Sequence, residues 1–146
     1  MSDQDSMDFN SGMAAFEAKH FSRAAQLLSP LAERGNDEAQ YRLAIMYQNG
    51  LGVTRNEEQA VKWMRAAAEQ GNALAQHGLG FMYLEGDCIS ADAAQAAQWF
   101  RLAAEQGLAG AQVTLSMLYA EGRGVAADPA ESRRWAELAG LAGLDG

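Results

Sequence analysis

The sequence lacks most of the residues on which covalent, redox or metal chemistry depends. Cysteine occurs once in 146 residues, as Cys88, which excludes an internal disulfide and a cysteine-cluster metal site. Histidine occurs twice, as His20 and His77, and neither has a second ligand at helical spacing. Serine-hydrolase, phosphate-loop and CxxC motifs are absent as well. We therefore expect a protein that is not an enzyme and that uses no cofactor or metal.

Positive charge is also scarce. Eleven Lys and Arg stand against nineteen Asp and Glu, which gives a net charge of −8. A nucleic-acid-binding surface needs clustered cations to neutralise phosphates, so this balance argues against one. Residues 1–7 show neither the basic nor the apolar segment of a secretory signal, and no apolar run is long enough to cross a bilayer. We expect a cytoplasmic protein that binds neither nucleic acid nor membranes.

The sequence is rich in self-similarity at a spacing of 36 residues, which is the mark of a repeat protein. All three tryptophans fall in one register, and tyrosines and glycines keep the same step. These recurrent positions are Trp63, Trp99, Trp135, Tyr47, Tyr83, Tyr119, Gly50, Gly86 and Gly122. Such a register predicts an array of equivalent structural units.

Each unit has the pattern of two helices. In the first helix, Ala39, Leu43 and Tyr47 lie four residues apart and form one apolar stripe. The second helix follows a capping residue, Asn56, with Gln59 three residues later as in a capping box. Glycines follow the ends of the helices, where a left-handed residue terminates them. One helix pair cannot bury both of its faces, so neighbouring pairs must stack into an α-solenoid.

The combined pattern resembles the Sel1-like repeat, a longer relative of the tetratricopeptide repeat. It reads A-x-x-x-L-x-x-x-Y-x-x-G-x-G-V and then A-x-x-W-x-x-x-A-A-x-x-G, and it recurs in residues 37–72, 73–108 and 109–144. Residues 7–36 resemble a plain tetratricopeptide helix pair with a shorter turn. The resemblance implies a single domain over residues 1–146. Its expected fold is an all-α, right-handed superhelical solenoid of about four antiparallel helix pairs.

The resemblance also implies a function. Sel1-like proteins serve as scaffolds, and many of them are bacterial. The resemblance therefore implies an adaptor for signalling or complex assembly that binds another protein or peptide. The concave face of such a solenoid is lined by the first helices. The tetratricopeptide register places on it Phe9, Met13, Phe16, Tyr41, Ile45, Gln48, His77, Phe81, Leu84, Val113 and Met117.

These groove residues admit two interpretations. Aromatic and methionine side chains suit the capture of a helix or an extended peptide, with Tyr41 and Phe81 as central anchors. Alternatively, several of them pack against neighbouring helices. The first interpretation predicts that Phe81→Ala weakens partner binding and leaves thermal melting nearly unchanged.

Three other functions stay open on the sequence alone. A sensor of a nucleotide or glycan would use the same groove, with Tyr41, Phe81 and an arginine stacking on the ligand, whereas an enzyme would need titratable groups that converge in a cleft. A structural subunit would dock through its ends. Self-association through the C-terminal helix is predicted from an apolar set of residues there, Leu138, Leu141 and Leu144.

Two expectations concern single residues. A tryptophan at each contact between neighbouring units should be part of the core. Trp99→Ala should therefore lower the free energy of unfolding by on the order of 3–5 kcal/mol. Cys88 occupies the position held by Gly52 and Gly124 in the other units. A non-glycine residue with positive φ costs about 1 kcal/mol, so we expect a distinct loop conformation around residues 87–89.

Overall fold

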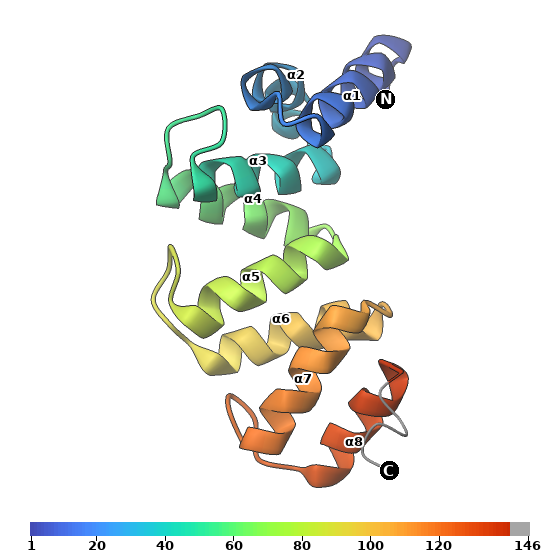
Figure 1. Cartoon of the computed structure of the whole chain (residues 1–146), viewed down its shortest axis with the longest axis vertical. Coiled ribbons are helices and arrows are strands. Elements are labelled where there is room, and N and C mark those ends of the chain that lie inside the picture. Colours follow the sequence, from blue (N-terminus) through green and yellow to red (C-terminus); the bar gives the residue numbers. More distant parts are fainter. Residues whose placement is uncertain (141–146) are drawn as a thin grey trace. The chain divides into compact units, whose positions relative to one another are not determined.

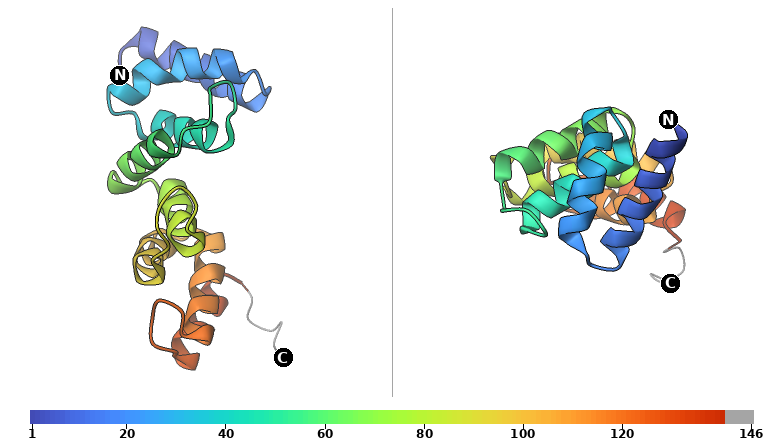
Figure 2. Two further views of the ribbon diagram at one scale, coloured as in Figure 1. Left: turned by 90° about the vertical axis from the view of Figure 1, so that its left-hand side faces the viewer. Right: turned by 90° about the horizontal axis from the view of Figure 1, so that it is seen from above.

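A computed structural model describes residues 1–140, and these residues form eight α-helices with no strand among them (Figure 1). Short turns join the helices into hairpins (Figure 2). None of the helices in the described part combines the length and apolarity that a membrane span requires. The helices are α1 (Asp3–Glu17), α2 (Phe21–Glu33), α3 (Asp37–Asn49), α4 (Glu57–Glu69), α5 (Ala73–Glu85), α6 (Ala93–Glu105), α7 (Ala109–Glu121) and α8 (Pro129–Leu138).

The chain divides into two compact units, and each contains two helix pairs. The first unit comprises residues 1–72 with α1 to α4, and the second begins at Ala73 and contains α5 to α8. In the first unit α2 packs against both α1 and α3, and in the second α6 packs against both α5 and α7. The second helix of the leading pair is thus covered on two sides. This is the burial that a lone hairpin cannot achieve.

The helices of a pair approach closely where a glycine faces a large side chain. A Cβ added at Gly12 would lie 2.6 Å from the Leu28 side chain, and one added at Gly80 would lie 2.9 Å from the Phe100 ring. Leu28 and Phe100 are both fully buried. The missing side chain on one helix therefore makes room for the large one on the other, which keeps the core close-packed.

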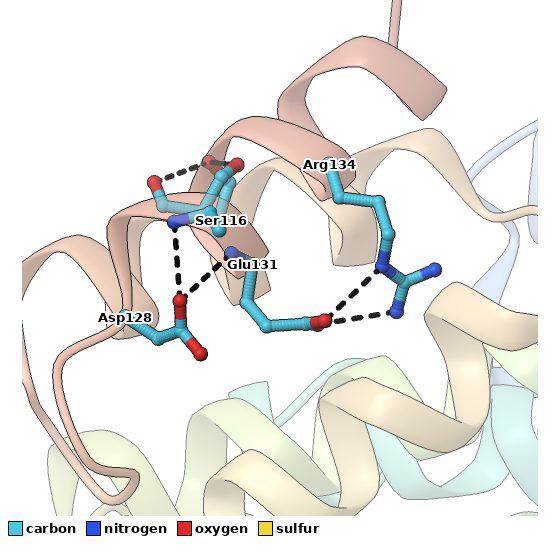
Figure 3. Close-up of polar contacts among 6 residues, drawn as sticks. Ser116, Asp128, Glu131 and Arg134 are labelled. Carbon is cyan, nitrogen blue, oxygen red and sulfur yellow. Dashed lines mark hydrogen bonds and ion pairs between the residues drawn. The ribbon is translucent and has the colours of Figure 1, made fainter.

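Helix starts and stops follow the chemistry expected from the sequence. The side chains of Asn56, Asp92 and Asp128 accept hydrogen bonds from backbone N–H groups of the first turns of α4, α6 and α8, at 3.0–3.1 Å. Figure 3 shows Asp128 bonded to two such groups. Gly50 and Gly122 end α3 and α7 in the left-handed conformation with φ of 67°. The predicted caps and stops are therefore confirmed at these positions.

A ladder of glutamines, which the sequence analysis missed, ties consecutive pairs together. Gln40 on α3 donates from Nε2 to the Ala32 carbonyl at the end of α2, at 3.1 Å. Gln70, which follows α4, donates to Gln40 Oε1 at 2.8 Å and thereby satisfies the amide oxygen. The second unit repeats both contacts, with Gln112 on the Ala104 carbonyl at 3.1 Å and Gln106 on Gln76 Oε1 at 2.9 Å. Gln40 and Gln112 are buried, so their bonds to the preceding helix fix the register between helix pairs. Gln70 and Gln106 are exposed and bond within their own helix pair.

The tryptophan prediction is wrong for the middle repeat. Trp63 and Trp135 are 5% and 3% exposed, but Trp99 is only half-buried. Phe100, the next residue, is the large side chain that α6 buries, because Gly80 leaves space for its ring. Trp99 therefore contributes less to the core than its register suggested.

The prediction of a distinct loop around Cys88 is also wrong. Cys88 has φ of 67°, close to the 70° of Gly52 and the 74° of Gly124. The hydrogen bond that closes each loop onto the preceding helix is also equivalent, with the Asp87 N–H donating to the Met82 carbonyl at 3.0 Å. The loop keeps the shape of its relatives, and the strain of a side chain in the left-handed region, on the order of 1 kcal/mol, stays in the folded state.

Phe100→Ala should lower the free energy of unfolding by about 3–5 kcal/mol, because it empties the space beside Gly80. Trp99→Ala should cost less than about 2 kcal/mol, because the indole is only partly buried in the folded chain. Urea unfolding followed by circular dichroism measures both changes. A Trp99 variant as damaged as the Phe100 variant would contradict this assignment of the core.

Cys88→Gly should stabilise the chain by about 0.5–1 kcal/mol, since relief of left-handed strain outweighs the added freedom of the unfolded state. Gly124→Ala is the matched opposite change. It should cost about 2 kcal/mol or more, because its Cβ would lie 2.1 Å from the Ala93 carbonyl oxygen. Thermal melting of both variants tests the pair, and a lower melting temperature for Cys88→Gly would count against the strain.

Candidate protein-binding surface

The predicted groove residues occupy one face of each first helix, opposite the buried stripe. On α3, for example, Ala39, Leu43 and Met46 are fully buried while Tyr41 and Ile45 are half-buried. Ten of the eleven predicted residues are half-buried, and Met117 is 54% exposed. We call this set the first-helix surface. It comprises Phe9, Met13 and Phe16 on α1, Tyr41, Ile45 and Gln48 on α3, His77, Phe81 and Leu84 on α5, and Val113 and Met117 on α7.

In the first unit, this surface holds a cation between two aromatic rings. The Arg42 guanidinium carbon lies 5.0 Å from the centre of the Phe16 ring and 5.4 Å from the centre of the Tyr41 ring. Phe16 in turn makes an edge contact with Phe21 of α2, with 5.4 Å between ring centres. Burial raises the pKa of the Tyr41 hydroxyl; Arg42 opposes this shift and Glu38 adds to it. Tyr41 therefore presents a neutral hydroxyl, which can donate a hydrogen bond, beside a positive charge.

In the second unit, the surface is built on a triangle of rings. Phe81 lies 4.9 Å from both His77 and Phe100, and His77 lies 5.6 Å from Phe100, measured between ring centres. All three pairs meet edge to face, the arrangement that aromatic quadrupoles favour. Phe100 belongs to α6 and was absent from the predicted site. It supports the two surface rings from beneath.

Phe81 therefore has two roles. It is half-buried against the core of the second unit and partly open to solvent. Truncation of Phe81 would remove packing from Phe100, so we no longer expect Phe81→Ala to leave melting unchanged. Its exposed part remains available to a partner.

His77 is held in its neutral form by its surroundings. Burial lowers the pKa of its imidazole from the ordinary value of 6.5. The Phe81 and Phe100 rings supply the apolar environment that disfavours the charged form. Near neutral pH, His77 therefore acts as a polar aromatic side chain and carries no charge.

The side chains of this surface are mainly aromatic and apolar. Within residues 1–140, no cluster of three His, Cys, Asp or Glu is arranged to hold a metal ion. The surface instead offers aromatic rings, thioethers and aliphatic groups with a few polar atoms between them. Such surfaces bind partners by removing apolar area from water.

The C-terminal helix presents a second, more polar surface. A hollow of about 300 Å³ between α7 and α8 is lined by Ser116, Ala120, Pro129, Ser132, Arg133 and Ala136. Ala136 lines it at the position that Phe100 holds one repeat earlier. Ser116, also in the lining, donates a hydrogen bond to the Ser132 carbonyl at 2.7 Å (Figure 3). Leu138 is 56% exposed, as predicted for this end, whereas the predicted Leu141 and Leu144 lie outside the described residues.

Comparison with known proteins identifies Sel1 repeats at residues 37–72, 73–108 and 109–144. The chain is similar to the crystal structure of a Sel1 repeat protein from Oxalobacter formigenes. The match covers 90% of the present chain, with 36% identity and a TM-score of 0.86. It is also similar to a protective antigen present in uropathogenic Escherichia coli strains that displays an SLR fold, with 36% identity and a TM-score of 0.88 over 95% of its length. No curated protein matches the sequence significantly.

These likenesses confirm the all-α solenoid predicted from the 36-residue spacing. The chain spans 54% of the Oxalobacter protein and 31% of the Escherichia antigen. The matched repeats begin at residue 37, so α1 and α2 lie before them, and the tetratricopeptide-like character of residues 7–36 stays a prediction.

The stability of the chain should depend on pH through His77. Because its pKa is lowered in the folded state, the unfolded chain binds more protons as the pH falls below 6.5. As the pH is lowered from 6.5 to the lower pKa of the folded state, the free energy of unfolding should therefore decrease. Above pH 6.5, His77 should not change how the free energy of unfolding varies with pH.

Urea unfolding of wild type, His77→Gln and His20→Gln over this pH range isolates the effect. His20→Gln is the control, because His20 is exposed and lies outside the aromatic triangle. His77→Gln should flatten the pH dependence and His20→Gln should not. Parallel curves for wild type and His77→Gln would show that the imidazole titrates alike in both states.

Proposed function

Because the chain belongs to the Sel1 repeat family, whose members are generally protein-interaction scaffolds, we propose that it is a non-catalytic adaptor that binds a partner protein or peptide on the first-helix surface. The family assignment confirms the resemblance predicted from the sequence. The Sel1 repeat family is also generally non-catalytic, which agrees with the adaptor role. Both neighbouring structures are bacterial, so bacterial signalling or complex assembly is the proposed setting.

The observation that carries the proposal is the state of burial of the first-helix surface. Ten of its eleven side chains are half-buried, so their positions are restricted while part of their area stays open to solvent. Half-buried aromatic rings lose little conformational entropy when a partner covers them. Central aromatic and methionine groups of this kind are typical binding hot spots.

Charge narrows the choice of partner. The net charge of −8 opposes nucleic acid and anionic membrane surfaces, which are polyanions. A protein or peptide with apolar anchors fits the surface better. We propose the cytoplasm as the compartment, where a free thiol such as that of Cys88 stays reduced.

Docking through the C-terminal end is the second proposed function. Leu138 is more than half exposed on the last helix, and an apolar residue there favours contact with another copy or subunit. Sedimentation of the purified chain at increasing concentration tests this alternative, since a monomer throughout would exclude self-association.

Met117→Gln should weaken partner binding on the first-helix surface by about five- to thirtyfold, because it replaces an exposed apolar anchor. Leu102→Gln is the matched control, since Leu102 is 45% exposed on α6 of the same unit and lies outside the first-helix surface. Both variants should melt like wild type.

The measurement is affinity purification from the native cell followed by titration of the recovered partner against the three proteins. Weaker partner binding by Met117→Gln alone supports binding on the first-helix surface. Equal binding by wild type and both variants would reject the second-unit part of the surface, and loss with Leu102→Gln alone would move the site to the second helices.

A further inference from the structure

Arg42 is a cation whose guanidinium contacts two aromatic rings and makes no hydrogen bond or ion pair within residues 1–140. It is half-buried on α3, and its guanidinium lies 5.0 Å from the Phe16 ring and 5.4 Å from the Tyr41 ring. Its Nε atom is enclosed and makes no hydrogen bond within residues 1–140. Aromatic faces attract a cation but leave its N–H donors unused. Because the buried Nε cannot be reached from solvent, the terminal Nη groups of this guanidinium are the donors that an incoming anion would meet.

The acidic side chain one helical turn before Arg42 is bound to another residue. Glu38 precedes Arg42 by one helical turn, the spacing at which acid and base usually pair. Its Oε1 instead accepts a hydrogen bond from Asn72 Nδ2 at 3.1 Å, and Asp37 accepts from the same amide at 2.9 Å. Other arginines of the chain do pair with carboxylates, as Arg34 does with Asp5 at 2.7 Å.

The repeat architecture does not require a cation at this position. The residues 36 and 72 positions later are Gly78 and Thr114, and neither carries a charge. The arginine therefore distinguishes the first unit within an otherwise regular pattern. The guanidinium lies against Phe16 and Tyr41, which both belong to the first-helix surface.

We propose that Arg42 binds a carboxylate of a peptide partner, an Asp or Glu side chain with apolar residues on either side of it. This inference rests on the proposed function and specifies the partner's chemistry. The planar guanidinium matches a carboxylate through paired N–H donors. The Phe16 and Tyr41 rings hold the plane in place and exclude water from one side, which strengthens the ion pair.

A single carboxylate suits the electrostatics better than a polyanion. The chain carries a net charge of −8, so a highly charged ligand would be repelled over most of the surface. One carboxylate in an apolar peptide meets the local cation and adds little long-range repulsion. The Tyr41 hydroxyl is neutral near pH 7 and can act as a second hydrogen-bond donor.

The test uses peptides selected from a phage library of random dodecamers against the immobilised full chain. Selected peptides should be enriched in Asp or Glu between apolar residues. The tightest peptide and its amide counterpart, with Asp or Glu replaced by Asn or Gln, are then titrated by fluorescence anisotropy. The amide change and Arg42→Gln should each weaken binding about tenfold or more, and the two together should add little further loss.

Two variants separate recognition from structure. Arg23→Gln is the matched control, because Arg23 is an exposed arginine on α2 of the same unit, and it should bind like wild type. Arg42→Met keeps an aliphatic side chain against Phe16 without the charge, so it should melt like wild type yet bind as weakly as Arg42→Gln.

The outcomes are distinct. Selected peptides without acidic enrichment, or peptides that bind Arg42→Gln and Arg42→Met as tightly as wild type, would overturn the carboxylate site and leave the adaptor function standing. Failure of wild type to select any peptide would overturn both. Equal weakening by Arg23→Gln would show that general charge, and not Arg42, controls the affinity.

Discussion

The structure depends on burying the second helix of a pair between two first helices. In the first unit α2 lies against α1 and α3, and in the second α6 lies against α5 and α7. Leu28 and Phe100 are fully buried in these helices. The first helices α3 and α7 also pack against two helices each, yet one face of each keeps side chains such as Tyr41, Ile45 and Met117 partly open to solvent. The candidate binding surface is thus a direct consequence of how the core is built.

Local chemistry made much of this fold predictable. A cap such as Asn56 and a stop such as Gly50 act on the backbone within a few residues, so their type and spacing determine the helix ends. The 36-residue recurrence then implied stacking, because identical hairpins have identical unburied faces. The predicted surface residues were found on one face because a helix has a fixed angular step. That they bind a partner stays a proposal.

The features that were missed depend on contacts between helices. Whether Trp99 or Phe100 points inward is decided by the space beside Gly80 on another helix, which the pattern of α6 alone does not contain. The glutamine ladder joins Gln40 to Ala32 and Gln70, residues brought together only by stacking. The Cys88 loop keeps its shape because the free energy of its closing hydrogen bond offsets the strain of positive φ at Cys88. The hydrogen bond from Asn72 to Glu38 likewise joins α3 to a residue that follows α4, which the pattern of α3 alone does not contain.

The central claim is that partners bind the open faces of the first helices, and methionine methyl groups report on it directly. Met117 and Met13 lie on the first-helix surface, whereas Met46, Met64 and Met82 are at most 2% exposed in the core. In a methyl-labelled NMR spectrum, addition of the purified partner should shift the Met13 or Met117 signals and leave the three core signals in place. Shifts confined to the core methionines, or to Met7 outside the surface, would contradict the account.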